Sequence, residues 1–325
     1  MPATRQLGPV PLFSLWAGLC LVAGLYGSWL GLGGRALAVT LAAFAFFLLV
    51  MLLSAARGVP EFIASRLGMA GAFFLGSAIF VFYLFYLLGT GTLAFARAGI
   101  AAGLIFLPLT LAASAEREAS GSWQDFLTLA GIWVAVKFLP LHWLWPYPGG
   151  RWGYVLTILL AVNVAVGTFL LLRRTSGVGY SIGWGRGWGR PVAGSLVLFA
   201  GIAIPLGHAL RFIEFAPHWS AWKTLPLTAL GILLFTAWPE EFLFRGLLQN
   251  MLSRASQSEL AGWWTASVLF GFSHITNGGF PNWRYVILAS IAGLCYGWTW
   301  RKTGSIFASA IVHAAVDITW HFLFR

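Results

Sequence analysis

The stretch LPLTALGILLFTAWPEEFLFRGLLQNML, residues 225–252, is an apolar run that carries Glu240, Glu241 and Arg245 near its middle. It is long enough to cross a bilayer, which takes about 20 predominantly apolar residues in a helix. A charge at bilayer depth costs about 2.5 to 3.5 kcal/mol on insertion scales, so such residues persist where they are paired, hydrated or functional. The rest of the chain is therefore interpreted around these three charges.

Composition places the whole chain in a membrane. Of its 325 residues 59% are hydrophobic and 9% are charged, and the mean hydropathy is +0.82. These values exclude an ordinary soluble domain and predict an all-α, polytopic transmembrane helical bundle in contact with the lipid bilayer. The net charge of +11 would suggest nucleic acid in a soluble protein. Here the basic residues are scattered between apolar runs, which indicates topology and anionic lipid, and we expect no nucleic-acid partner.

The apolar runs predict ten or eleven membrane spans. They fall near residues 11–32, 36–55, 69–90, 96–113, 126–146, 153–172, 191–210, 225–252, 261–276, 285–300 and 304–323. The polar, Gly-rich interval RRTSGVGYSIGWGRGWGR, residues 173–190, separates two modules. We expect an N-terminal transmembrane module of about six spans at 1–175, whose role the sequence leaves open, and a second membrane domain at 176–325.

The Lys/Arg distribution favours a cytoplasmic N-terminus. In that orientation the inner loops carry Arg5, Arg57, Arg66, Arg117, Arg173, Arg174, Arg186, Arg190, Arg254, Arg301 and Lys302. The outer loops carry Arg35, Arg97 and Arg151, and an eleven-span count leaves Arg325 outside. We expect the chain in the inner (plasma) membrane of a bacterium.

Three polar clusters lie in the second module. The first is Glu240, Glu241 and Arg245; the second is His274; the third is His313 with Asp317 and His321. Glu241 and Arg245 are four residues apart, as are His313, Asp317 and His321, so each set shares one helix face. At 1.5 Å per residue, Glu240, His274 and Asp317 lie about 18 to 20 Å from the inner ends of their spans, and His313 about 13 Å. Polar groups at a similar depth in separate helices indicate one buried, hydrated site.

These motifs resemble those of a known family. Glu240-Glu241-Phe-Leu-Phe-Arg245, Phe270-Gly-Phe-Ser-His274 and His313-Ala-Ala-Val-Asp317, in this order on separate membrane helices, are similar to the signature of the CPBP (CAAX-processing and bacteriocin-processing, or Abi) intramembrane proteases. The resemblance covers roughly residues 225–325, and it implies that the membrane domain at 176–325 is a CPBP-like catalytic domain. It implies a glutamic-type peptide hydrolase, without cofactor or metal, acting on a membrane-anchored or lipidated protein or peptide.

The resemblance also implies roles for the residues. Glu240 would activate a water with help from His274, and His313 and Asp317 would polarise the scissile carbonyl and stabilise the oxyanion. Asp317 stands where many family members carry Asn. Because an ionised Asp cannot donate a hydrogen bond, Asp317 would have to be protonated or would orient His313 instead. Glu241 is expected to pair with Arg245, and Pro239 to disturb the helix ahead of the two carboxylates.

Other interpretations stay open at this stage. His313, Asp317 and His321 form a ligand stripe that could bind zinc together with His274 and Glu240, leaving an open coordination position. The charged residues could also form a structural ion-pair network, and His313 with Asp317 a helix-packing hydrogen bond. Finally, a non-enzymatic membrane protein, such as a transporter or an immunity factor that sequesters a peptide, could use the same cluster.

Overall fold

The computed structural model describes residues 4–116, 121–139 and 141–325, and within these ranges it is almost entirely helical. This confirms the predicted all-α fold class. The described strands, β1 (Thr4–Gln6) and β2 (Gly183–Gly185), pair in one small sheet. The chain forms two compact units, one of residues 6–176 and one of residues 177–325 together with Thr4 and Arg5.

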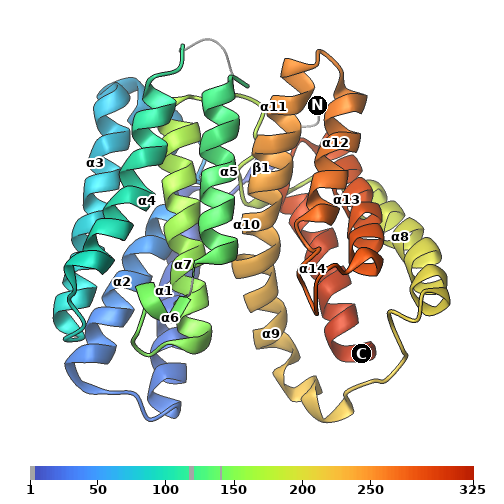
Figure 1. The fold of residues 1–325 in the computed structure, drawn as a ribbon, viewed down its shortest axis with the longest axis horizontal. Helices are drawn as coiled ribbons and strands as arrows, with labels where there is room; N and C mark the ends of the chain where they lie inside the picture. The colour runs from blue at the N-terminus through green and yellow to red at the C-terminus, as the bar shows by residue number, and fades with distance from the viewer. Residues whose placement is uncertain (1–3, 117–120, 140) are drawn as a thin grey trace. The chain divides into compact units, whose positions relative to one another are not determined.

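The N-terminal unit is built of helices that follow one another with short connections (Figure 1). They are α1 (Pro9–Trp29), α2 (Gly34–Leu53), α3 (Val59–Gly89), α4 (Phe95–Ala113), α5 (Trp123–Phe138), α6 (Leu141–Leu144) and α7 (Gly150–Ala165), which continues as the π-helical segment η1 (Val166–Leu172). Asp125 in the first turn of α5 accepts two hydrogen bonds from the guanidinium of Arg173, which follows η1. Both side chains are buried, so this ion pair ties the two ends of the α5–η1 segment together.

The second unit contains the helix that carries the two adjacent glutamates. After α8 (Gly189–Ala209), one continuous helix covers residues 219–255. Its parts are the 3₁₀ turn η2 (Trp219–Thr224), α9 (Leu225–Ile232), the π-helical η3 (Leu233–Ala237), α10 (Trp238–Glu241), the π-helical η4 (Phe242–Gln249) and α11 (Asn250–Ala255). The chain then forms α12 (Glu259–Phe272), α13 (Trp283–Thr303) and α14 (Ile306–Leu323).

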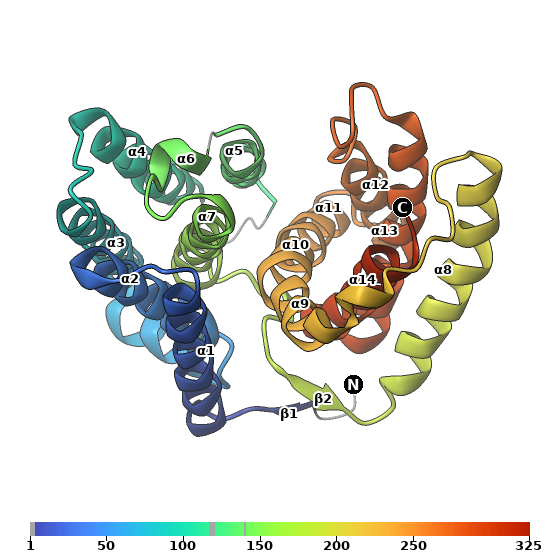
Figure 2. The same ribbon diagram turned by 90° about the horizontal axis from the view of Figure 1, so that it is seen from below.

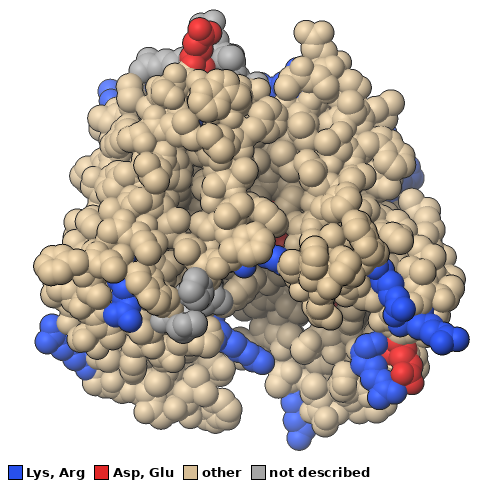
Figure 3. Space-filling model, viewed as in Figure 1, with Lys and Arg blue, Asp and Glu red and all other residues tan. Residues whose placement is uncertain are grey.

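Viewed along the helices in Figure 2, α14 lies between α10 and α13, α12 packs on α13, and α8 covers the outer side of α13 and α14. The surface seen in Figure 3 consists mainly of uncharged side chains, as expected for a protein surrounded by lipid.

Eight helices of the described residues are long and apolar enough to cross a membrane, fewer than the ten or eleven spans predicted. They are α1, α2, α3, α4, α7 with η1, α8, the continuous helix 219–255, and α14. The other three predicted spans correspond to α5, α12 and α13. Helix α5 has 16 residues and α12 has 14, and the 21-residue α13 carries Arg284 at its start and Arg301 with Lys302 at its end. The chain is thus a multi-pass integral membrane protein. Arg117, used in the orientation argument, lies outside the described residues.

Candidate active site

The first motif lies where helical geometry changes twice. Trp238–Glu241 is a single turn of α-helix between two π-helical segments, and π-helical turns inside α-helices are frequent at functional sites. Pro239 occupies the second position of that turn and has no amide hydrogen to donate to the preceding turn, where the π-helical η3 lies. Glu241 and Arg245 point into the packed interior and their side chains are fully buried. The Glu240 side chain, one residue earlier, points in another direction and is 31% exposed.

Glu241 is the centre of the hydrogen-bond network. Arg245 Nε donates to its Oε2 at 3.0 Å, and the hydroxyl of Ser309 donates to the same oxygen at 2.5 Å. Its other oxygen, Oε1, lies 2.9 Å from Nδ1 of His313. Because a carboxylate only accepts hydrogen bonds, His313 carries a proton on Nδ1 in this contact. The expected Glu241–Arg245 pair is therefore present, and Glu241 also links the first motif to α14.

The phenylalanine of the second motif joins the three motifs by ring contacts. The ring centroid of Phe270 lies 4.8 Å from that of His274 and 5.7 Å from that of His313. The guanidinium of Arg245 lies 4.8 Å from the same centroid, within cation–π range. Nη1 and Nη2 of Arg245 are buried without a hydrogen-bond partner among the described residues, so the faces of Phe270 and Tyr296 are their surroundings. Phe270 thus holds the buried cation and both histidines in place.

His274 follows the end of its helix, where the sequence predicted a position inside a span. Helix α12 ends at Phe272, and His274 lies in the turn that follows. Its Nδ1 is 2.9 Å from the carbonyl oxygen of Phe270, which fixes the proton on Nδ1. The other ring nitrogen, Nε2, is not used in this contact, and His274 is close enough to Glu240 for the two to interact electrostatically.

Close helix packing positions this turn. A Cβ atom on Gly271 would lie 1.9 Å from Ser290 Oγ and 2.6 Å from the carbonyl oxygen of Val286, so only glycine allows α12 to approach α13 this closely. Gly293 on α13 similarly faces the backbone of Ser267 on α12. Small residues at such contacts are typical of helix pairs in membranes.

Helix α14 presents the third motif on one face. Its N-terminus is capped by Ser305, whose hydroxyl accepts hydrogen bonds from two backbone amides. Ser309, His313 and Asp317 follow at intervals of four residues and share one face. Nε2 of His313 lies 3.5 Å from Asp317 Oδ2 and 3.9 Å from Glu240 Oε2. His313 therefore bonds Glu241 with one nitrogen and faces the two partly exposed carboxylates with the other.

The structure thus brings together Glu240, Glu241, Arg245, His274, His313 and Asp317. His321 does not join them: it is exposed near the end of α14, where its ring contacts Phe322 and its carbonyl oxygen lies 3.3 Å from Nδ1 of His218. Within the described ranges no group of three or more His, Cys, Asp or Glu side chains is arranged to hold a metal ion.

Two residues of the network were not singled out from the sequence. Ser309 could have been found, because it stands four residues before His313 on the same helix face. Tyr296 gave no such signal: its ring stacks on His313 at 4.6 Å between centroids, but it comes from α13 and lies between small and apolar neighbours in the sequence.

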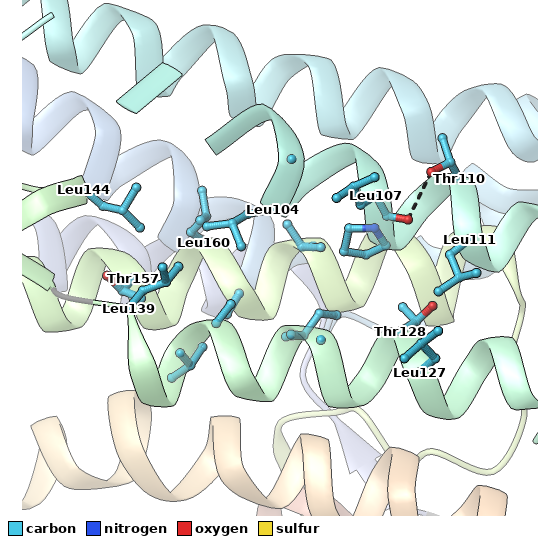
Figure 4. Close-up of a pocket in the computed structure, with 18 residues that line it drawn as sticks. Leu104, Leu107, Thr110, Leu111, Leu127, Thr128, Leu139, Leu144, Thr157 and Leu160 are labelled. Carbon is cyan, nitrogen blue, oxygen red and sulfur yellow. Dashed lines mark hydrogen bonds between the residues drawn. The ribbon is translucent and has the colours of Figure 1, made fainter. Parts of the chain in front are cut away.

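The N-terminal unit contains a separate apolar cavity of about 590 Å³ between α4, α5 and α7 (Figure 4). Leucines such as Leu107, Leu111 and Leu160 line it. The hydroxyl of Thr110 donates to backbone carbonyls of its own helix. None of the described residues that line this cavity has a titratable side chain, so they offer no group for acid–base chemistry.

Comparison with known proteins agrees with the motifs. Residues 221–319 match the family model described as type II CAAX prenyl endopeptidase Rce1-like. No curated protein and no solved structure matches the chain. The matched range contains all three motifs, from Glu240 to Asp317, which confirms the resemblance to the CAAX-processing proteases. Residues 221–319 of this chain are therefore similar to the Rce1-like family of type II CAAX prenyl endopeptidases.

Proposed function

We propose that this protein is an intramembrane endopeptidase that hydrolyses a peptide bond in a membrane-anchored or lipidated protein or peptide, with water activated by Glu240. The observation that carries the proposal is the different surroundings of the two glutamates. The carboxylate of Glu241 accepts hydrogen bonds from Arg245, Ser309 and His313. The carboxylate of Glu240 is partly exposed and lies near His274 and His313. A general base needs access to the proton that it removes, and Glu240 has that access.

The positions of the groups support the following reaction. A water between Glu240 and His274 gives a proton to Glu240 while its oxygen attacks the scissile carbonyl. His274, with its proton fixed on Nδ1, accepts a hydrogen bond from that water through Nε2. The carbonyl oxygen becomes an oxyanion, which needs hydrogen-bond donors in a site shielded from bulk water. Glu240 finally passes its proton to the departing amine.

Asp317 acts through His313 in this scheme. Its Oδ2 lies 3.5 Å from His313 Nε2, so the carboxylate can orient the imidazole and favour a proton on Nε2. With Nδ1 bonded to Glu241 and a proton on Nε2, His313 can donate to the oxyanion.

The family match and the surroundings of the site support a lipidated substrate. The family model is described as type II CAAX prenyl endopeptidase Rce1-like. A farnesylated peptide ending in Cys-aliphatic-aliphatic-X is therefore the first probe to use. A lipid anchor would place the peptide bond beside helices that themselves cross the bilayer.

The test is cleavage of that peptide, with an internal fluorophore–quencher pair, by the purified protein in phospholipid vesicles. We expect Glu240→Gln to abolish cleavage while the variant folds normally. The control is Glu214→Gln, which changes an exposed glutamate paired with Arg325 and should cleave at the wild-type rate. Full cleavage by the Glu240→Gln variant would refute Glu240 as the base.

The zinc mechanism is tested in the same assay. If His274, His313 and Asp317 bound a catalytic zinc, the purified protein would contain the metal in stoichiometric amount, and a strong chelator would stop cleavage. We expect cleavage to continue in the chelator. Loss of cleavage that zinc restores would favour the metal mechanism over the glutamic one.

A further inference from the structure

Tyr285 lies beside the catalytic cluster although none of the three motifs contains it. It is in the first turn of α13, where its backbone amide donates to the capping side chain of Asn282. Its ring centroid is 4.9 Å from that of His274 and 5.4 Å from that of Trp320, which follows Asp317 by one helical turn. The ring is therefore held between the second and the third motif.

The hydroxyl of Tyr285 has polar side chains around it. It hydrogen bonds with the side chain of Asn277, and it is close enough to Asp317 and Glu240 to interact with both electrostatically. When the Asn277 amide is the donor in this contact, the phenolic proton stays free for another acceptor. A tyrosine hydroxyl keeps its proton at neutral pH, because its ordinary pKa is about 10.

The site has many acceptors and few donors. Glu240, Glu241 and Asp317 bring three carboxylates, which accept hydrogen bonds when ionised. Arg245 is fully buried and bonded to Glu241. Nδ1 of His313 is also bonded to Glu241, so His313 has only Nε2 to offer to an oxyanion. A second hydrogen-bond donor would stabilise the negative charge that develops on the oxyanion.

We propose that Tyr285 is a catalytic residue that donates a hydrogen bond to the oxyanion beside His313. This inference rests on the proposed peptidase function. The hydroxyl keeps its proton throughout: it stabilises the negative oxygen and releases it when the carbonyl re-forms. Tyr285 supplies the neutral donor that Asp317 cannot supply as a carboxylate.

The first test is Tyr285→Phe, which keeps the ring contacts with His274 and Trp320 and removes the hydroxyl. With the farnesylated peptide in vesicles, kcat should fall about 100- to 1,000-fold, the usual effect of losing one oxyanion donor, while KM changes little. The affinity for a phosphinate analogue of the same peptide should fall by a similar factor, because such an analogue resembles the tetrahedral intermediate. Unchanged kcat and unchanged analogue affinity would overturn the proposal.

The second test separates a catalytic role from a structural one. Tyr285→Phe should lower kcat less when it is added to Asp317→Asn than when it is added to the wild type, because the amide introduced at position 317 offers a replacement donor. Asp317→Asn alone is the reference, so the effect of that substitution on His313 cancels. A purely structural role of the hydroxyl predicts the same loss of kcat in both backgrounds, and that result would refute the proposal. If Tyr285→Phe is fully active and Glu240→Gln is inactive, the tyrosine assignment fails and the peptidase stands. If the wild type cleaves nothing, the proposed function fails and this inference fails with it.

Discussion

At the scale of single residues, Glu240 and Glu241 are neighbours in the chain with carboxylates in different environments. Glu241 receives three hydrogen bonds in a fully buried position, and Glu240 stays partly exposed. Burying a charge is tolerated when it is paired and hydrogen-bonded, which describes Glu241. The two positions should therefore respond differently to the same substitution.

Glu241→Gln should reduce stability strongly, because it leaves Arg245 as a buried cation without its carboxylate. Removing one partner of a buried pair typically costs about 3 to 5 kcal/mol. Thermal unfolding in detergent would measure the loss, with Glu240→Gln as the neighbouring control that should change little. The double variant Glu241→Gln with Arg245→Met should recover part of the stability. Equal stability of Glu241→Gln and Glu240→Gln would contradict the different environments assigned to the two carboxylates.

Ser309→Ala should reduce stability more than Ser195→Ala. Both serines are buried, but Ser309 bonds the carboxylate of Glu241 and Ser195 bonds the neutral groups of Cys295 and Thr299. Hydrogen bonds to charged groups contribute about 1.5 to 3 kcal/mol and ordinary ones about 1 kcal/mol. Thermal unfolding of the two variants tests this. A loss of stability in Ser195→Ala as large as that in Ser309→Ala, or larger, would disprove it.

At the scale of the elements, the α12–α13 pair shows what sequence patterns could and could not predict. Hydropathy located both helices, because a run of apolar residues is visible without knowledge of its neighbours. It did not predict that α12 ends at Phe272, since the first turn signal in the sequence, Asn277-Gly278-Gly279, comes only five residues later. Likewise, four-residue spacing predicted the Glu241–Arg245 pair, whereas the Glu241–His313 contact depends on how two distant helices are rotated.

Gly271→Ala should separate α12 from α13 and displace His274. The added Cβ would meet the Val286 carbonyl oxygen at 2.6 Å, and a backbone atom cannot rotate away as the Ser290 hydroxyl can. Overpacking of this kind costs about 1 to 3 kcal/mol. The control is Gly201→Ala in α8, where a Cβ meets nothing within 4 Å. The unfolding temperature and the rate of peptide cleavage should both fall for Gly271→Ala and stay unchanged for Gly201→Ala. An unfolding temperature and a cleavage rate equal to those of the wild type in Gly271→Ala would refute the packing argument.

At the scale of the whole molecule, the two units contain buried ion pairs of different kinds. In the N-terminal unit Asp125 and Arg173 pair one acid with one base, and Arg173 also donates to two backbone carbonyls. In the second unit Arg245 and His313 are surrounded by three carboxylates, two of them partly exposed. A balanced, satisfied pair is typical of structural support, and an unbalanced cluster open to the outside is typical of a reaction site.

The orientation of the second unit can be tested with single cysteines. The Lys/Arg pattern predicts Arg254, Arg301 and Lys302 on the cytoplasmic side. After replacement of Cys20 and Cys295, Ser256→Cys should react with a membrane-impermeant maleimide only in permeabilised cells, whereas Ser220→Cys should react in intact spheroplasts. Both serines are exposed, so accessibility alone does not distinguish them.

The result also decides from which side the site is approached. Arg284 at the start of α13 donates to the carbonyl oxygen of Arg211, which follows α8. The α12–α13 turn with His274 and the α8–α9 segment with Ser220 therefore lie at the same end of the second unit. Labelling of Ser220→Cys in intact spheroplasts would place this end toward the outer face. The reverse pattern would place it toward the cytoplasm and would show that the Lys/Arg argument is wrong for this chain.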